Sequence, residues 1–381
     1  MTLTLFEPSC LNGLLLANRF VRSATWEGLA SADGSATPAL ETLYADLAGN
    51  DVGLVISGHA FVDPAGRLGL QQLGAHDDAL VPSLAGLARA VHDAGGRFAL
   101  QISHGGLSAA GDSAGEAPFG PSVLQTESGP VGMAMTREQV AAVPRAFARA
   151  ALRARSAGCD AVQIHAAHGY LLSSFLSPFF NKRTDEYGGD ARGRVRLVAE
   201  VVAAVRGAVG PGFPVLIKIN SEDFLPGGVT VDDMLVTAAA VEEAAVDAIE
   251  LSGGTSLSGD YRSVRTGAAL RGSRGAYYQA AALRLKRRLR IPLMLVGGIR
   301  TLAEAERLVV EGVADYVSLS RPFICEPGLV ARWKRGDLRG ARCISCNECF
   351  YRGFRGEGVA CVRRPDGGHR ALGAPPAPRP A

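Results

Sequence analysis

The sequence predicts an α/β protein, a (β/α)8 TIM barrel with a C-terminal cysteine-rich extension. Three observations support this prediction. Eight short apolar runs alternate with longer Ala-, Leu- and Arg-rich segments, chemically active side chains follow the short runs, and four cysteines gather near the end of the chain. Alternating strands and helices are typical of a parallel sheet, and eight such repeats are typical of a barrel. The chain has 381 residues, 47% of them apolar, which suffices for a large core.

The repeats are read from the order of apolar and helix-favouring segments. The strand candidates are Arg19–Arg22, Leu54–Ser57, Arg97–Ile102, Ala161–Ile164, Val215–Ile219, Ala248–Leu251, Leu293–Val296 and Tyr316–Leu319. The helix candidates include Leu80–Ala94, Arg137–Ala157, Arg192–Val209, Val231–Ala244, Gly275–Arg288 and Leu302–Glu311. Many of the helical segments end in Gly or Ala-Gly, as helix C-termini often do.

A doubly wound sheet is the alternative architecture. It needs a glycine-rich phosphate turn after an early strand, whereas Gly95-Gly96 precedes a strand. The connection from Trp26 to Ala48 is predicted to be irregular. So is the Gly-, Ser- and Pro-rich stretch from His104 to Thr136, which we expect to contain a small hairpin. Both resemble active-site loops.

The domain boundaries follow from these patterns. We expect the barrel over residues 1–340 and a four-cysteine segment packed on it over residues 341–362. The Pro-, Ala- and Gly-rich end, residues 363–381, is expected to be disordered.

Charge and hydropathy argue against several classes of partner. The formal net charge is +3, from 40 basic and 37 acidic residues, and no basic stripe stands out, so nucleic acid is not an expected partner. No apolar run is long enough to span a bilayer, and the first residues lack the pattern of a signal peptide. We expect a cytoplasmic protein.

The segment Gln163–Tyr170 is the most informative stretch of the chain. It places His165, His168 and Tyr170 just past a strand-like run, where barrel enzymes carry catalytic side chains. Imidazole N–H groups can polarise a carbonyl or bind an anion, and a nearby phenol can deliver a proton. The alternative is a helix start with polar side chains. The specific loop that follows, Leu176–Gly189, favours function.

The last two strand ends predict a phosphate site. Gly297 and Gly298 follow strand seven and Arg321 follows strand eight, the usual phosphate-binding position of such barrels. Tight turn packing is the alternative for the glycines. Lys218 lies in an apolar strand and needs an anionic partner, either a ligand or a neighbouring carboxylate such as Glu222.

The seven cysteines are unevenly placed. Cys10, Cys159 and Cys325 are scattered, whereas the other four follow the spacing Cys343-x2-Cys346-x2-Cys349-x11-Cys361. In a reducing compartment this clustering indicates metal or iron–sulfur ligation rather than disulfides. Four thiolates at this spacing fit either an iron–sulfur cluster or a structural zinc ion, and unligated thiols are the remaining alternative.

Six motifs together resemble the Old Yellow Enzyme family of FMN-dependent reductases, from about Phe6 to Cys361. They are Asn18–Ser23, Leu100–Gly105, the His165/His168/Tyr170 group, Asn181–Gly189, Val296–Gly298 and Ser320–Phe323. The resemblance implies an FMN site, with contacts from Ser23, Ala24, Thr25, Gly58, Gln101, Lys218, Gly297, Gly298, Ser320 and Arg321. Gln101 would bond the pyrimidine edge, Lys218 would lie near N1 and O2, and the glycines with Arg321 would hold the phosphate.

The resemblance also implies the reaction. His165 and His168 would hold the carbonyl oxygen of an unsaturated substrate, hydride would pass from the flavin to the β-carbon, and Tyr170 would protonate the α-carbon. NAD(P)H is the implied electron donor. Relatives of this kind are commonly dimers or larger, so a homo-oligomer is expected.

Within the family, the cysteine segment is similar to the branch with bacterial 2,4-dienoyl-CoA reductase and trimethylamine dehydrogenase. There four cysteines hold a [4Fe–4S] cluster, which implies the same role for Cys343, Cys346, Cys349 and Cys361. This chain departs from the pattern at Trp26, where a flavin-tuning Cys or Thr is usual, unless a one-residue shift uses Thr25. Ser320 stands where Gly or Ala commonly precedes the arginine. Those relatives continue into nucleotide-binding domains beyond the point where this chain ends.

Three functions follow, in order of preference. The first is an ene-reductase acting on an enone or enal, with electrons from NAD(P)H or from another protein. The second is a flavin dehydrogenase or demethylase that passes electrons through an iron–sulfur cluster to a partner protein. The third is a non-catalytic redox-sensing or electron-carrying flavoprotein.

Overall fold

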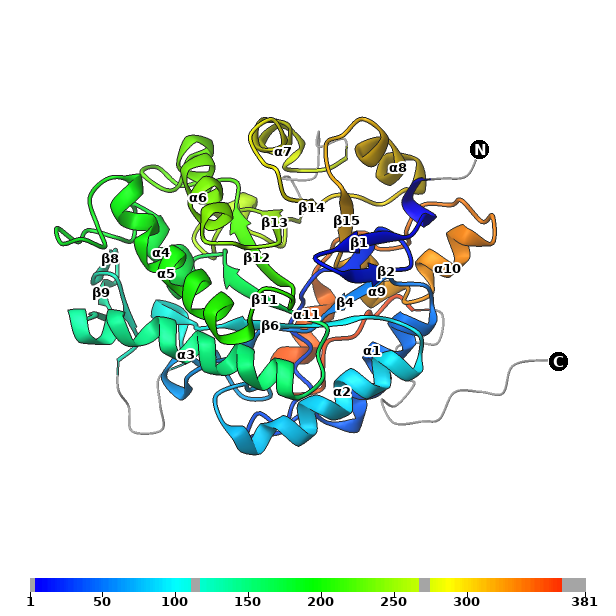
Figure 1. Ribbon diagram of the computed structural model, residues 1–381, viewed down its shortest axis with the longest axis horizontal. Helices are drawn as coiled ribbons and strands as arrows, with labels where there is room; N and C mark the ends of the chain where they lie inside the picture. Colours follow the sequence, from blue (N-terminus) through cyan, green and yellow to red (C-terminus); the bar gives the residue numbers. More distant parts are fainter. Residues whose placement is uncertain (1–3, 111–116, 267–274, 365–381) are drawn as a thin grey trace.

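Eight parallel strands form a closed barrel in a computed structural model of the chain (Figure 1). The structure describes residues 4–110, 117–266 and 275–364. The barrel strands are β3 (Phe20–Arg22), β4 (Leu54–Ile56), β6 (Phe98–Ser103), β11 (Ala161–Ala166), β12 (Val215–Asn220), β13 (Ala248–Ser252), β14 (Leu293–Val296) and β15 (Tyr316–Leu319). Each pairs in parallel with the next, and β15 pairs with β3, which closes the sheet. The predicted barrel is confirmed.

Helices connect successive strands on the outside of the barrel (Figure 1). The longer ones are α1 (Pro38–Gly49), α2 (Val81–Asp93), α3 (Arg137–Ser156), α5 (Ala191–Val209), α6 (Val231–Glu243), α7 (Gln279–Lys286) and α8 (Leu302–Val310). Short helices are α4 (Leu171–Leu176), α9 (Arg321–Cys325), α10 (Leu329–Lys334) and α11 (Glu348–Phe354). The first connection, expected to be irregular, contains α1. Its Pro38 occupies the first turn, where the missing N–H costs no hydrogen bond.

Side-chain caps fix where several helices begin. Thr136 and Gln139 form a reciprocal capping box at the start of α3, and Thr230 and Asp233 form one at the start of α6. Asp190 accepts from the backbone of Gly193 at the start of α5. These bonds satisfy N–H groups that the first helical turn leaves without partners, so local sequence determines these boundaries.

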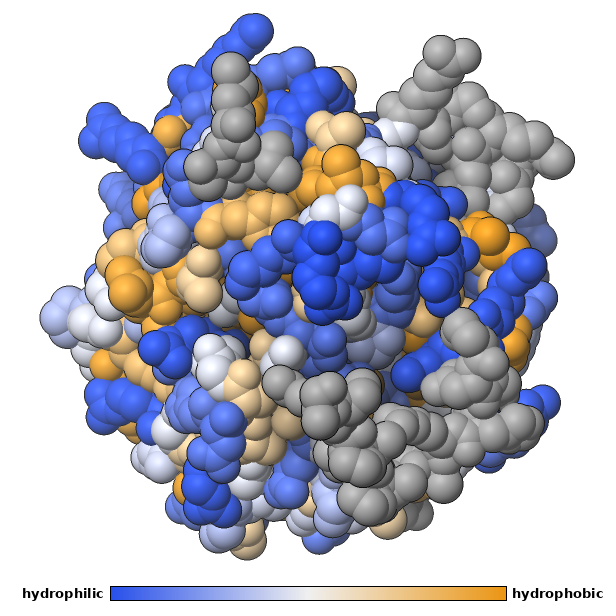
Figure 2. Space-filling model, turned by 90° about the vertical axis from the view of Figure 1, so that its right-hand side faces the viewer, coloured by the Kyte–Doolittle hydropathy of each residue, from blue (hydrophilic) through white to orange (hydrophobic). Residues whose placement is uncertain are grey.

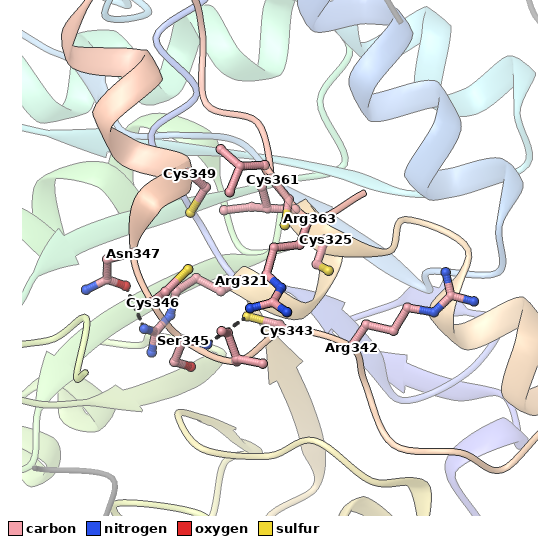
Figure 3. A pocket seen from close by; sticks show the side chains of 13 residues that line it. Arg321, Cys325, Arg342, Cys343, Ser345, Cys346, Asn347, Cys349, Cys361 and Arg363 are labelled. Carbon is pink, nitrogen blue, oxygen red and sulfur yellow. Dashed lines mark hydrogen bonds between the residues drawn. The ribbon is translucent and has the colours of Figure 1, made fainter. Parts of the chain in front are cut away.

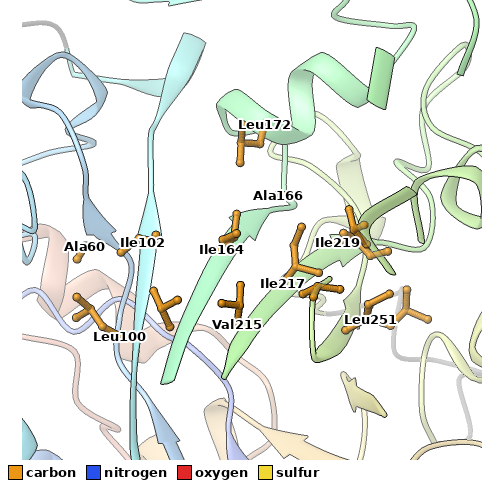
Figure 4. Close-up of a cluster of buried hydrophobic side chains, with 14 of the residues drawn as sticks. Ala60, Leu100, Ile102, Ile164, Ala166, Leu172, Val215, Ile217, Ile219 and Leu251 are labelled. Carbon is orange, nitrogen blue, oxygen red and sulfur yellow. The ribbon is translucent and has the colours of Figure 1, made fainter. Parts of the chain in front are cut away.

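Alternation along the strands separates two cores. Outward-facing residues of β6, β11, β12 and β13 belong to one large core that also contains buried residues of the helices. Figure 4 shows part of it, with Leu100, Ile164, Ile217 and Leu251 on the strands. The inward-facing residues at the opposite side of the strands form a second apolar cluster inside the barrel, made by Leu11, Leu16, Val21, Leu54, Ile56, Ala99, Ala161, Leu216, Ala248, Met294 and Tyr316. Successive residues of a strand face opposite sides of the sheet. The residue two positions after each interior-cluster residue of a strand therefore also faces inward, one layer closer to the carboxyl end of the strand.

Two hairpins lie outside the barrel sheet. The antiparallel strands β1 (Ser9–Leu11) and β2 (Leu14–Leu16) contribute Leu11 and Leu16 to the interior cluster and so cover its amino-terminal end. In the loop after β6, strands β8 (Leu124–Thr126) and β9 (Gly129–Val131) form the predicted small hairpin. The same loop pairs β7 (Phe119–Gly120) with β10 (Met133–Ala134) in parallel, which the sequence did not indicate.

Figure 2 shows one face of the molecule, on which hydrophilic residues are widespread and apolar residues form separate patches. Within the described residues, no helix combines the length and the apolar character that crossing a bilayer requires. The expected disordered tail, residues 363–381, lies almost wholly outside the described residues.

Candidate active site

A chain of buried polar side chains crosses the barrel just above the apolar interior cluster. Gln101 Nε2 donates to Gln163 Oε1 (2.6 Å), and Gln163 Nε2 donates to Glu250 Oε2 (2.8 Å). The same carboxylate oxygen accepts from Lys218 Nζ (3.0 Å), which also donates to Ser23 Oγ (2.8 Å). All five side chains are buried. Buried polar groups need partners, and this network supplies them across four strands and the residue that follows β3.

The carboxylate beside Lys218 is Glu250, so the suggestion of Glu222 is wrong. Glu222 follows the strand, whereas Glu250 faces Lys218 on the neighbouring strand β13, in direct register. Burial alone would raise the pKa of Glu250, but the Lys218 ammonium and hydrogen bonds from Ser23 and Gln163 bring it below the ordinary value. The two groups therefore form a buried ion pair. Alternation in Ala248–Ser252 was the available signal, because it places Glu250 inside the barrel.

His165, His168 and Tyr170 come together at the carboxyl end of β11. The rings of His165 and Tyr170 meet edge to face with centroids 5.0 Å apart, and those of His165 and His168 do so at 5.1 Å. His168 has φ of +67°, a conformation that few non-glycine residues adopt. Its N–H donates to Asn220 Oδ1 (3.1 Å), which fixes this turn. The sharp turn brings both imidazoles and the phenol to one side of the barrel mouth.

The hydrogen bonds and burial define the protonation of these groups. Ala167 N–H donates to His165 Nδ1 (3.2 Å), so the neutral ring carries its proton on Nε2. Burial, together with His168, Lys218 and His59, holds the pKa of His165 well below its ordinary value. Burial and Lys218 lower the pKa of His168 to about 3. Burial raises the pKa of Tyr170. Near neutral pH the site therefore holds neutral imidazoles and a protonated phenol, which are hydrogen-bond and proton donors.

His59 is a third imidazole in this group. Its ring centroid lies 5.8 Å from that of Tyr170 and 6.4 Å from that of His165. Gln72 Nε2 lies 2.8 Å from His59 Nδ1 and also donates to the His59 carbonyl, which orients the ring. Only the folded loop between β4 and α2 brings His59 to Tyr170.

The buried histidines give a testable pH dependence of stability. Burial lowers the pKa of His59 and of His104 to about 4, and that of His168 to about 3. Below about pH 6.5 the unfolded chain binds protons that the folded chain does not, so stability falls as pH drops from about 6.5 towards 4. Each histidine contributes a slope of up to about 1.4 kcal/mol per pH unit in that window.

Urea unfolding at pH 7.5, 6.5 and 5.5 measures this dependence, and stability is expected to be lowest at pH 5.5. His104→Gln should make the slope shallower, since it removes one of the buried histidines that contribute to it. A free energy of unfolding that stays constant over this range would contradict the assignment of neutral buried imidazoles.

The predicted phosphate region has the backbone shape that the prediction requires. Gly297 and Gly298 have φ of +103° and +86°, and a Cβ on Gly298 would lie 2.2 Å from the carbonyl oxygen of Gly275. Only glycine is compatible with this turn. Arg321, at the start of α9, is buried, and its Nη1 donates to the Arg265 carbonyl and to Asn347 Oδ1, each at 2.7 Å. Within the described residues its other nitrogens donate no hydrogen bond that the structure shows.

The remaining residues near the predicted cofactor site have different neighbours. Thr25 is buried and its Oγ1 lies 2.7 Å from Ser320 Oγ, which links β3 to the phosphate region. Trp26 instead stacks on Phe354 of α11 with ring centroids 5.4 Å apart. Thr25 rather than Trp26 therefore lies against the end of β15. Ala24 is half-buried beside the interior cluster.

Gly58 has a packing role that the sequence did not reveal. Its N–H donates to Glu27 Oε1 (3.0 Å) and lies 3.1 Å from Tyr44 Oη, and a Cβ there would lie 2.1 Å from Glu27 Oε2. Glu27 also accepts from Arg22 (2.6 Å) and Tyr44 (2.7 Å). This buried cluster holds the loops after β3 and β4 together. The glycine is required to admit the Glu27 carboxylate.

These residues fit an FMN. A flavin offers amide and carbonyl groups at one end and a phosphate at the other, and the structure places Gln101 and Lys218 at buried strand positions on one side of the barrel mouth. The glycine turn and Arg321 lie at the ends of β14 and β15. Backbone N–H groups and a guanidinium suit a phosphate dianion. The donor set and the glycine cradle match the two ends of the cofactor.

Five cysteines, not four, line one cavity beside the barrel mouth (Figure 3). The cavity encloses about 340 Å³ together with its opening. The predicted cysteines in its wall are Cys343, Cys346, Cys349 and Cys361. The fifth, Cys325, comes from α9, and its thiol is hydrogen-bonded to Cys361. All five are free thiols.

The cysteine cavity does not form a compact single-ion site. Across residues 4–110, 117–266 and 275–364, no group of three or more His, Cys, Asp or Glu side chains is arranged to hold a metal ion. A zinc ion bonds each sulfur at about 2.3 Å and so requires the thiols close together. The structure therefore shows no metal site within the described residues, and both zinc and the iron–sulfur cluster stay predictions.

The cysteine segment is attached to the barrel by backbone and side-chain contacts. Val359 N–H donates to the carbonyl of Glu27 (2.7 Å), and Asn347 Nδ2 donates to the carbonyl of Val264 (2.8 Å). With the Trp26–Phe354 stack, these contacts join the segment to the loops after β3 and β13.

Comparisons with known proteins place this barrel in a family of flavin oxidoreductases. The chain belongs to the NADH:flavin oxidoreductase / NADH oxidase family, whose model matches residues 4–338. It is 34% identical over 374 residues to a metal reductase of Desulforamulus reducens, covering 96% of this chain and 54% of that protein. The chain thus spans about half the length of this relative.

Two solved structures show the same architecture. A 2-naphthoyl-CoA reductase in complex with 2-naphthoyl-CoA superposes with a TM-score of 0.87 at 25% identity, covering 96% of this chain and 57% of that one. An Old Yellow Enzyme homologue from Zymomonas mobilis superposes with a TM-score of 0.76 at 26% identity, covering 90% and 96%. The resemblance to Old Yellow Enzymes is therefore confirmed, and the chain belongs to this family of flavin oxidoreductases.

Proposed function

We propose that this oxidoreductase binds FMN, takes electrons from NAD(P)H and reduces the activated C=C bond of an unsaturated carbonyl compound. One observation carries the proposal: a protonated phenol and two neutral imidazoles gather at the barrel mouth, on the strand next to Lys218. Bound FMN would supply the hydride. The chain itself would have to bind the carbonyl oxygen, hold the alkene and deliver one proton.

The imidazoles are suited to the carbonyl oxygen. His165 carries its proton on Nε2, which leaves a neutral donor for an oxygen that gains negative charge. His168 Nε2 lies 2.8 Å from Ser252 Oγ, so the serine determines which ring nitrogen of His168 remains to face a ligand. Two neutral donors would stabilise an enolate-like oxygen without delivering a proton to it prematurely.

Tyr170 is suited to protonate the α-carbon. Its ring packs edge to face on His165 and beside His59, so the phenol lies next to the proposed carbonyl site. Its raised pKa keeps it protonated near neutral pH. Lys218 and Gln101, fixed by the network through Glu250 and Gln163, would place positive charge and an amide at the flavin's pyrimidine edge.

The cysteine cavity supports an additional proposal, a [4Fe–4S] cluster held by Cys343, Cys346, Cys349 and Cys361. The support is a donor set of thiols alone around one cavity, against the cofactor barrel. If the cluster is bound, the protein could also act as a flavin dehydrogenase or demethylase that exchanges electrons with a partner protein through the cluster. We rank it below alkene reduction, because the His165–Tyr170 constellation has no use in plain electron transfer.

An anaerobic spectrum of the purified protein, combined with iron and sulfide analysis and an NAD(P)H-dependent assay with 2-cyclohexenone, tests these proposals together. We expect two flavin bands, about four iron and four sulfide per chain, and enone-dependent oxidation of NAD(P)H. Flavin without iron would refute the cluster and leave the reductase. A protein that binds no FMN would refute both.

A further inference from the structure

Arg265 is a buried cation enclosed by aromatic rings. It lies in the loop after β13, and only 5% of the residue is exposed. Its guanidinium carbon lies 4.8 Å from the ring centroid of Phe224 and 5.2 Å from that of Tyr261. The corresponding distances are 4.7 Å for Tyr277 and 5.1 Å for Tyr278. Four aromatic faces therefore stabilise one positive charge.

Most of the hydrogen-bonding capacity of this guanidinium is not used by the described residues, although Tyr278 accepts one hydrogen bond from it. Nε and Nη2 are fully enclosed and have no hydrogen-bond partner within the described residues. Aromatic faces attract the charge but offer no acceptor to Nε and Nη2. The charge of Arg265 opposes the rise that burial causes in the pKa of Glu222, but the structure shows no ion pair between the two side chains within the described residues. A buried donor edge without an acceptor is disfavoured unless a ligand completes it.

The backbone around Arg265 is held from behind. The Arg265 carbonyl accepts from Arg321 Nη1 (2.7 Å), and the Val264 carbonyl accepts from Asn347 Nδ2 (2.8 Å). These two bonds tie the loop to α9 and to the cysteine segment. These backbone bonds pre-organise the guanidinium without using Nε or Nη2.

The rings around Arg265 belong to the wall of the candidate active site. Tyr278 Oη donates to the carbonyl of Gly253 (3.1 Å), and the preceding residue, Ser252, holds His168 Nε2 at 2.8 Å. On the other side, a Cβ on Gly297 would lie 3.0 Å from the ring of Tyr278. Arg265 is therefore one aromatic ring away from both the His168 segment and the glycine turn.

We propose that Arg265 forms an oxyanion-binding site of the active site, one that takes the carboxylate or phosphate of an acidic unsaturated substrate. The proposal deepens the proposed function and rests on substrate entering beside His168. A guanidinium edge binds such groups with two parallel charge-assisted hydrogen bonds, and the surrounding rings exclude water that would weaken them. The phosphate of FMN has the same chemistry, and the experiment separates the two sources.

Binding of a matched pair of unreactive ligands tests the proposal without turnover. Oxidised FMN-loaded protein is titrated with 4-oxopentanoate and with its methyl ester, which differ in one negative charge, and the flavin absorbance is followed. We expect the carboxylate to bind more tightly than the ester. Arg265→Gln should weaken carboxylate binding about 10- to 100-fold and leave the ester unchanged. Arg265→Lys should be intermediate, because lysine lacks the bidentate edge.

Arg262→Gln is the matched control, because Arg262 is an exposed arginine of the same loop whose Nε donates to the carbonyl of Gly259. It should change neither affinity. Equal affinity of the wild-type protein for acid and ester would overturn the proposal even if the Arg265 variants do not fold. An equal loss of both ligands in Arg265→Gln would overturn it as well.

Affinities of the flavin-free protein for FMN and riboflavin, from quenching of flavin fluorescence, separate the sources. If Arg265→Gln weakens FMN but not riboflavin, the anion is the cofactor's phosphate and the substrate site is refuted. If both flavins bind as in the wild type while the carboxylate is lost, the substrate site is supported. Selective carboxylate binding without alkene reduction would refute the proposed function and retain the oxyanion site.

Discussion

Tyr170→Phe is expected to slow alkene reduction about 10²- to 10⁴-fold, the usual contribution of a positioned proton donor. The substitution removes one oxygen and keeps the ring that packs on His165. Reduction of the flavin by NAD(P)H needs no proton from this phenol, so its rate should be unchanged. Anaerobic stopped-flow absorbance of the two half-reactions, with 2-cyclohexenone as the oxidant, measures both rates.

Tyr187→Phe is the control for this experiment. Its hydroxyl donates to Glu200 (3.1 Å), in the α5 region and outside the active site, so both half-reactions should proceed as in the wild type. An unchanged alkene half-reaction in Tyr170→Phe would show that another group delivers the proton, and His59, 5.8 Å away between ring centroids, would be the next candidate.

Glu250→Leu is expected to destabilise the fold by about 3–5 kcal/mol, because it leaves the Lys218 ammonium buried without its counter-charge. The side chains of this pair are 3% and 0% exposed, so water cannot replace the carboxylate. The variant also removes the acceptor of Gln163 Nε2. Thermal unfolding at a fixed FMN excess measures the change.

The double variant Lys218→Met/Glu250→Leu should recover much of this stability, since apolar side chains of similar size often replace a buried pair without loss. Glu311→Gln is the surface control. It breaks the Arg307–Glu311 pair, whose side chains are 39% and 52% exposed, and should cost less than about 0.5 kcal/mol. A single-variant loss no larger than that of the surface control would mean that Lys218 is neutral or solvated.

The barrel could be predicted because its signals are local. Leu293–Val296 and Tyr316–Leu319 are bounded by turn residues, and both strands have the predicted limits. The strand starting at Ala161 runs two residues further than predicted, to Ala166, because His165 pairs in register with Lys218 inside the barrel. In the sequence alone, the polar His165 suggests that the strand has ended. The sequence does not show that Lys218 on the neighbouring strand pairs with it.

The sequence allowed most residues of the site to be identified, but fewer of the contacts between them. Reading the strand ends identified His165, His168 and Tyr170, whose proximity follows from their spacing along one turn. Glu250 required knowledge of which strand neighbours β12 and of the register. Cys325 lies 18 positions before Cys343, and only convergence of α9 with the cysteine segment brings the two thiols into one cavity.

Arg265 shows a different limit. Its loop has no periodicity, and the rings around it come from residues 224, 261, 277 and 278, which meet only in the folded chain. An arginine in a polar loop is ordinarily solvated, so its burial could not be inferred from sequence.

Closure of the barrel between β3 and β15 has a consequence for synthesis of the chain. Val317 pairs with Phe20, so the first barrel strand lacks one of its two neighbours until almost the whole barrel has been translated. Until then the growing sheet has open edges with unpaired backbone groups, which favour association between nascent chains. The long sequence separation of this last pairing also adds to the entropy cost of folding. A ribosome-bound intermediate of this protein is consequently a client for chaperones that cover strand edges.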